Sequence, residues 1–118
     1  MKRVALALCA IALSAVTVLA ADVSGSWNVD GDVMGNPVKF PCVMKQDGET
    51  LSGTATLEGK DVPMTGTVKE TAVTFEFDSV HEGSTYHLVF TGTLGDDGGL
   101  KGAIAVAGVE GTFTATKQ

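Results

Sequence analysis

From about residue 24 to its end, the chain alternates apolar and polar residues with a period of two. Such alternation is typical of β-strands that bury one face, because successive side chains of a strand point to opposite sides. Short clusters of Gly, Asp, Asn and Glu interrupt the alternation and suit tight hairpin turns. The pattern predicts eight strands, at residues 24–33, 37–46, 50–57, 61–68, 72–79, 84–94, 99–107 and 109–117.

The connections between these runs are too short for parallel crossovers, which need a dozen or more residues, so antiparallel pairing is expected. One parity of every run is apolar, and the other is mostly Thr, Ser, Lys and Glu. The strands should therefore enclose one core, either as a closed sheet or as two facing sheets. The bulky members of the expected inward face are Trp27, Phe40, Phe75, Phe77, Tyr86, Phe90 and Phe113.

A short repeat of the form apolar-x-Gly-small-apolar favours the closed sheet. It occurs at VSGSW, LSGTA, MTGTV, FTGTL, LKGAI and VEGTF, and parity places each central glycine on the inward face. Glycine inside a strand costs about 0.5–1 kcal/mol relative to alanine, so six of them need a geometric reason. Glycines allow the strong bending of a tight barrel, and closure leaves no free sheet edges. The sequence predicts an all-β fold, an eight-stranded antiparallel up-and-down β-barrel, with a β-sandwich as the alternative.

Composition bounds the organisation and the partners. A chain of 118 residues corresponds to one domain. Its formal net charge of −6 leaves no positive field for nucleic acid or an anionic membrane.

The first twenty residues have the layout of a secretory signal. A basic start at Lys2-Arg3 precedes an apolar run, and small residues end it at Ala20. We expect residues 1–20 to be removed, which leaves a single barrel domain at 21–118 that is secreted or periplasmic and has no membrane span. Cleavage would also remove Cys9, so Cys42 could not form a disulfide within the chain.

The motifs resemble those of the calycin group of barrels, the lipocalins and avidins. Gly25-Ser26-Trp27 is similar to the G-x-W that opens such barrels, and LSGTA, MTGTV and FTGTL look like avidin strands. The resemblance implies an eight-stranded barrel with a small internal cavity and leaves a homo-oligomer open. It also implies that Lys117 covers Trp27 through a cation–π contact.

Several residues depart from the avidin pattern. Val29 stands where avidins place the asparagine that holds biotin, Ala55 replaces an expected tyrosine, and Gly111 replaces an expected acid. Trp27 is the chain's sole tryptophan, so the tryptophans that wall the biotin site are missing. The residues therefore argue against biotin binding.

No catalytic or metal-binding set emerges from the sequence. His87 is expected to face outward and His81 to lie in a turn, while Cys42 is expected to be a buried, unreactive thiol. Asp30, Asp32 and Asn36 do not have the spacing of a calcium loop, and no phosphate-binding glycine motif is present. The sequence predicts a protein that is not an enzyme and has no catalytic residues, bound metal or cofactor.

The interior remains as the candidate site, because an eight-stranded barrel can either fill with side chains or hold one small ligand. The sequence predicts a non-enzymatic barrel that binds a small apolar ligand in its interior. The alternative is a protein-interaction module, an inhibitor or an accessory domain, whose barrel core is filled. The expected ligand-binding residues are Trp27, Phe40, Phe75, Phe77, Tyr86 and Phe90.

Overall fold

The computed structural model describes residues 22–118, so the expected signal segment lies outside the described residues. The described chain forms eight strands, and each bound falls within two residues of the expected one. The strands are β2 (Gly25–Val33), β3 (Asn36–Asp47), β4 (Thr50–Leu57), β5 (Lys60–Lys69), β6 (Ala72–His81), β7 (Ser84–Leu94), β8 (Leu100–Val106) and β9 (Val109–Lys117).

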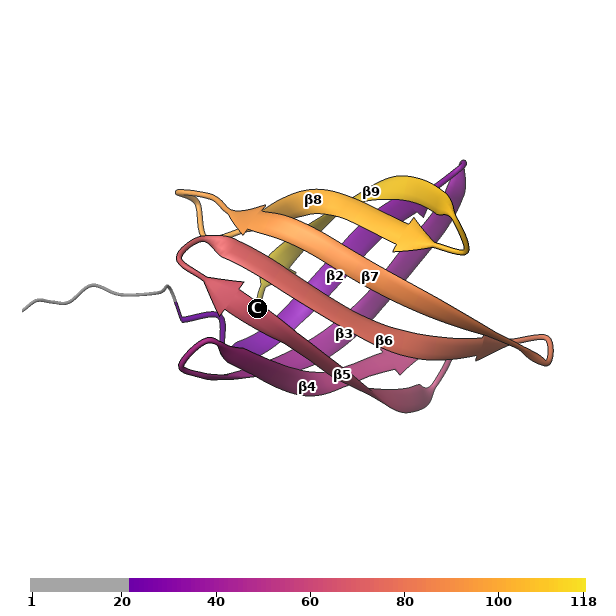
Figure 1. The fold of residues 1–118 in the computed structure, drawn as a ribbon, viewed down its shortest axis with the longest axis horizontal. Helices are drawn as coiled ribbons and strands as arrows, with labels where there is room; N and C mark the ends of the chain where they lie inside the picture. Colours follow the sequence, from indigo (N-terminus) through magenta and orange to yellow (C-terminus); the bar gives the residue numbers. More distant parts are fainter. Residues whose placement is uncertain (1–21) are drawn as a thin grey trace, which may run out of the picture.

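The strands close into an antiparallel up-and-down barrel (Figure 1). Each strand pairs with the next along the chain, and β9 returns to pair with β2. The register at the seam places Val29 opposite Phe40 on one side and opposite Ala115 on the other. This architecture confirms the barrel and excludes the β-sandwich.

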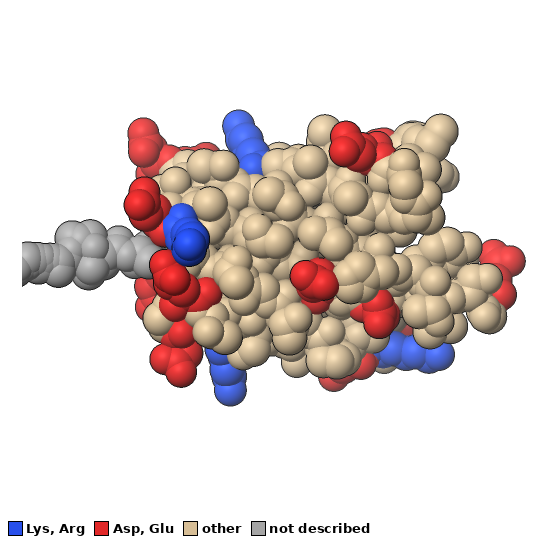
Figure 2. All heavy atoms as spheres, in the orientation of Figure 1, with Lys and Arg blue, Asp and Glu red and all other residues tan. Residues whose placement is uncertain are grey.

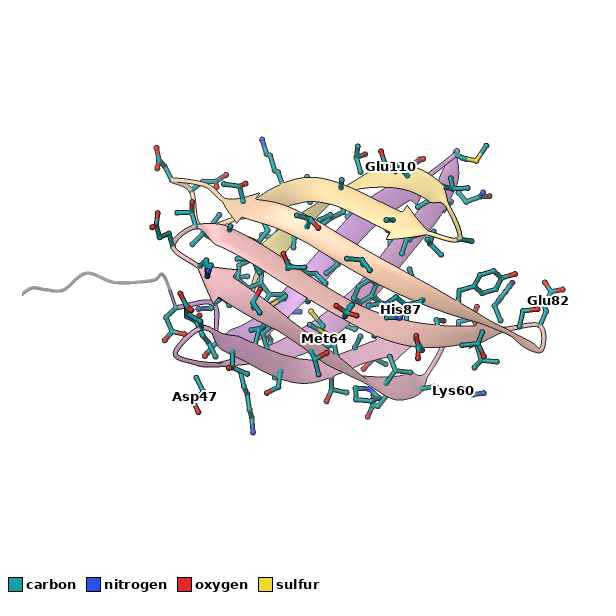
Figure 3. All side chains as sticks on the ribbon, in the orientation of Figure 1. Asp47, Lys60, Met64, Glu82, His87 and Glu110 are labelled. Carbon is teal, nitrogen blue, oxygen red and sulfur yellow. The ribbon has the colours of Figure 1, made fainter. Side chains whose placement is uncertain are left out.

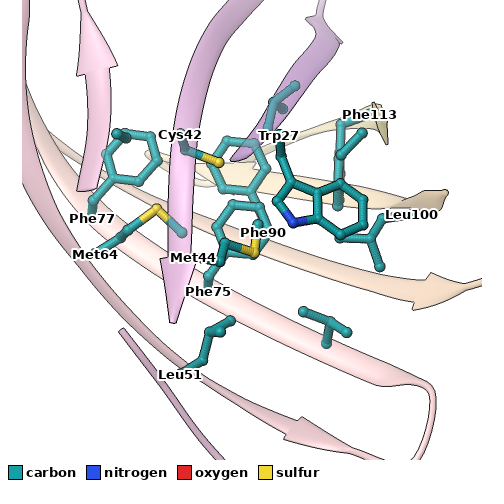
Figure 4. Close-up of a cluster of buried hydrophobic side chains, with 14 of the residues drawn as sticks. Trp27, Cys42, Met44, Leu51, Met64, Phe75, Phe77, Phe90, Leu100 and Phe113 are labelled. Carbon is teal, nitrogen blue, oxygen red and sulfur yellow. The ribbon is translucent and has the colours of Figure 1, made fainter. Parts of the chain in front are cut away.

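The barrel's middle is filled by side chains of the expected parity (Figure 4). Phe90 lies at the centre of an aromatic cluster, stacked on Phe75 with ring centroids 4.8 Å apart and edge-on to Phe113 at 5.2 Å. Phe40 and Phe77 complete the cluster, each with its ring centroid 5.6 Å from that of Phe90. Each buried ring contributes about 2–3 kcal/mol, and each aromatic pair adds about 0.5–1.5 kcal/mol.

One end of the barrel is closed by the residues that precede β2. Val23 is fully buried, and its backbone carbonyl accepts a 2.9 Å hydrogen bond from the indole Nε1 of Trp27. The Val23 amide donates to the side-chain oxygen of Gln46 at 2.8 Å. These bonds hold Val23 as a plug over the deep core. Val23 opens the VSGSW repeat and has the inward parity of Gly25, although it precedes the first expected strand.

The inward glycines let neighbouring strands approach more closely than a side chain would allow. A Cβ added to Gly66 would lie 1.9 Å from the carbonyl oxygen of Thr74, and the ladder places Gly66 opposite Phe75. Gly102 has the same relation to the Thr91 carbonyl and lies opposite Phe113. Large rings therefore fill the space beside the glycines, as curved sheets require.

We predict that Gly66→Ala lowers the free energy of unfolding by more than Gly92→Ala. The new methyl group of Gly66→Ala would collide with backbone, whereas the nearest atom at Gly92 is the rim of the Phe113 ring at 2.9 Å. Overpacking of this kind costs about 1–3 kcal/mol. Urea unfolding, followed by the emission of buried Trp27, measures the difference; equal effects of the two substitutions would contradict this explanation.

Candidate functional site

The end opposite Val23 is open. Four two-residue turns surround it, and both residues of each turn have positive φ, the type I′ geometry that suits the twist of a hairpin. The turns are Met34-Gly35, Glu58-Gly59, Glu82-Gly83 and Ala107-Gly108.

Inside this ring of turns lies a concave space of about 530 Å³, which we call the cup. Its floor is the top of the filled core, formed by Phe77 and Leu88. One wall is largely apolar and comes from β2, β3, β8 and β9, with Asn36 and Lys39 of β3 as its polar members. The residues of that wall include Val33, Val38, Val106 and Val109.

The opposite wall belongs to a two-stranded ribbon that projects past the rest of the barrel (Figure 1). The β5–β6 ladder ends at Glu76 and the β7–β8 ladder ends at Leu88, while β6 and β7 stay paired as far as His81 and Ser84. We call residues 77–87 the arm. Glu82 lies at its tip in Figure 3.

The arm lines the cup with three polar side chains, Ser79, His81 and Tyr86, and the rest of the rim adds those of Asn36, Lys39 and Glu58. Nδ1 of His81 lies 3.9 Å from a carboxylate oxygen of Glu58 in the β4–β5 turn, and Nε2 lies 3.1 Å from Glu82. The contact with Glu58 joins the arm to the neighbouring rim. His81 is thus the last residue of β6 and lines the cup, which corrects its expected place in a turn.

On the outer face of the arm, His87 links β6 to β7 (Figure 3). Its Nδ1 lies 2.6 Å from Asp78 and its Nε2 lies 2.9 Å from Glu76. The hydrogen bond with Asp78 is the main cause that raises the pKa of His87, and the bond with Glu76 acts in the same direction. Both carboxylates are satisfied best when the imidazole carries two protons.

We predict that the pKa of His87 lies above its usual value of 6.5 and falls when Asp78 is changed to Asn. Because the folded pKa is the raised one, the stabilising effect is present below the unfolded pKa and is lost as pH rises through the folded pKa. NMR titration of the His87 ring gives the pKa directly. Glu49→Gln, far from the arm on an exposed turn, is the control; an unshifted His87 would contradict the pairing.

The structure separates the six expected ligand-binding residues into two groups. Phe77 and Tyr86 line the cup, and Tyr86 is 38% exposed there. The structure gives the Tyr86 hydroxyl no hydrogen-bond partner among residues 22–118. The remaining four lie in the packed core and do not line the cup: Trp27, Phe40, Phe75 and Phe90. Parity identified which residues face inward but not how deep each one lies.

Lys117 lies opposite Trp27 in the β2–β9 ladder. The end of its aliphatic chain covers Gly25, with Cε 2.8 Å from the place that a Cβ would take. The structure therefore places Lys117 at the plugged end, beside the strand that carries Trp27.

Cys42 is buried, as its parity predicted, and burial raises the pKa of its thiol to about 11. The thiolate is the reactive form of cysteine. Raising the thiol pKa from 9.0 to about 11 lowers the thiolate fraction at neutral pH about a hundredfold. We predict that Cys42 reacts with a soluble disulfide reagent at least a hundredfold more slowly in the folded protein than in urea. Comparable rates in the two states would contradict its burial.

Within residues 22–118, no group of three or more His, Cys, Asp or Glu side chains is placed to hold a metal ion. The same stretch contains no helix with the length and apolar character needed to cross a membrane.

The chain matches no protein-family model and no curated protein. It is similar to the solved structure of a redesigned β-barrel, with 16% sequence identity and a TM-score of 0.57. The match covers 81% of this chain and 91% of the other. At this identity the similarity concerns the fold alone. The chain is an all-β, closed, eight-stranded antiparallel barrel.

Proposed function

We propose that this protein is a non-enzymatic barrel that binds a small, largely apolar molecule in the cup at its open end. One observation carries the proposal: the strands continue past the filled core and enclose a space of about 530 Å³. Ligand sites are usually concave spaces of about 300–1,000 Å³, mostly apolar and with a few polar groups that orient the ligand.

The division of the cup's walls supports an amphipathic ligand. Val38, Val106 and Val109 offer apolar surface on one side, where Asn36 and Lys39 are the polar lining residues. Ser79, His81 and Tyr86 offer hydrogen-bonding groups on the other. A ligand with an apolar body and one polar edge would satisfy both walls.

The proposal differs in place from the interior pocket expected from the sequence. The rings of Phe40, Phe75 and Phe90 contact one another in the barrel's middle, so that region is occupied by side chains. Binding in the cup leaves this packing intact, and the ligand would lie on Phe77 rather than between the deeper rings.

Blocking the cup tests the proposal. The side chain of Ser79 lines the cup, whereas its neighbour Val80 points outward and is 64% exposed. We predict that Ser79→Phe weakens the binding of an uncharged naphthalene dye at least tenfold, because the new ring occupies the site. Val80→Phe, the matched control on the opposite face of β6, should bind the dye as the unmodified protein does.

Trp27 reports whether both variants remain folded, since it is fully buried at the far end of the barrel. If the folded protein takes up no dye, or if both substitutions weaken binding equally, the cup is not the site and the proposal fails.

A further inference from the structure

Besides forming one wall of the cup, the arm has a free β-sheet edge. Pairing between β5 and β6 ends at Thr65 and Glu76, so residues 77–81 of β6 have no partner on that side among the described residues. Residues 60–64 of β5 are paired with β4 alone. The barrel wall therefore splits along this line towards the open end.

Hairpin geometry shows which backbone groups face the free edge. In a hairpin with a two-residue turn, the residues that flank the turn exchange hydrogen bonds, and bonded and non-bonded pairs then alternate. His81 and Ser84 flank the Glu82-Gly83 turn. The amide and carbonyl groups of Val80 and Asp78 consequently point away from β7, towards the gap.

The prolines distinguish this edge from the unpaired edges of β3 and β5. The same geometry points the nitrogens of Pro37 and Pro41 away from β2, on the side where the β3–β4 ladder begins only at Cys42. It points the nitrogen of Pro63 towards the gap beside β6. Proline offers no donor, so it protects an edge against pairing. The chain has 3 prolines, and none lies on the free edge of β6.

The free edge of β6 is also pre-formed and acidic. His87 fastens β6 to β7 through Asp78 and Glu76, which keeps the arm extended without support from β5. Five carboxylates lie on residues that border the split in the wall. The opposing basic residue on residues 60–64 of β5 is Lys60. These carboxylates are Glu58, Asp61, Glu76, Asp78 and Glu82. Figure 2 shows several acidic side chains on this face.

We propose that the arm binds an extended, basic segment of a partner protein, which adds as a strand along β6 at residues 77–81. Backbone hydrogen bonds to Asp78 and Val80 would supply affinity, as in other cases of strand addition. Alternate side chains of the added strand would point into the cup towards Phe77, and the others would meet the carboxylates outside. The chain's own net charge of −6 argues against a second copy as the occupant. The proposal does not require a small ligand in the cup.

A nine-residue peptide of alternating Lys and Val, capped at both ends and labelled with a fluorophore, is the probe. It should bind the protein, whereas the same peptide with Glu in place of Lys should bind at least tenfold more weakly. The amide protons of Asp78 and Val80 should exchange at least tenfold more slowly in the complex, a readout that needs no variant.

Substitutions on the two edges of the arm locate the site. Val80→Pro removes an outward donor of β6, and loss of one hydrogen bond should weaken binding about fivefold. Thr85→Pro blocks the opposite edge at the residue paired with Val80, and Val80→Thr keeps the donor. Both controls should bind within twofold of the unmodified protein.

The proposal is overturned if the Lys–Val peptide does not bind, if Asp78 and Val80 gain no protection, or if Thr85→Pro weakens binding as much as Val80→Pro. A protein that dimerises through Val80 would also overturn it, because the occupant would then be a second copy. Dye binding in the cup can persist through each of these failures, so the two proposals are tested separately.

Discussion

Closure of the barrel depends on backbone approaching backbone at the inward glycines. Where Gly66 faces the Thr74 carbonyl, the two strands leave no room for even a methyl group. This contact bends the wall tightly enough for eight short strands to meet. The conformational cost of glycine is offset because the space gained on the inner side is taken by rings such as Phe75.

Along most of the barrel axis, the curved wall surrounds a core that side chains fill. Only at the open end does the wall continue around a space that they do not fill. In the deep part, Val23 and the aromatic cluster form a core that is closed to solvent. At the open end the ladders stop at different heights, and the arm continues alone beyond Glu76 and Leu88. The hollow space and the free backbone edge both arise from this unequal length of pairing.

Much of the fold could be predicted because alternation reports parity directly. It identified the eight strands, the burial of Cys42 and the inward glycines. It did not reveal the cup, because position along the axis depends on the register between strands. Tyr86 and Phe90 share one face of β7, yet Tyr86 lies beyond the end of β8 and is partly exposed. The partners of His87 were missed for the same reason, since they lie across the strand rather than along it.

The plug gives the molecule a fixed polarity. The described chain begins at residue 22, next to the buried Val23. It ends at the same end of the barrel, where the backbone amide of Gln118 donates to the carbonyl of Ser26. Both limits of the described chain thus leave from the base of the barrel. A protein fused to either of them, or a solid support linked there, would leave the cup and the arm facing outward and accessible.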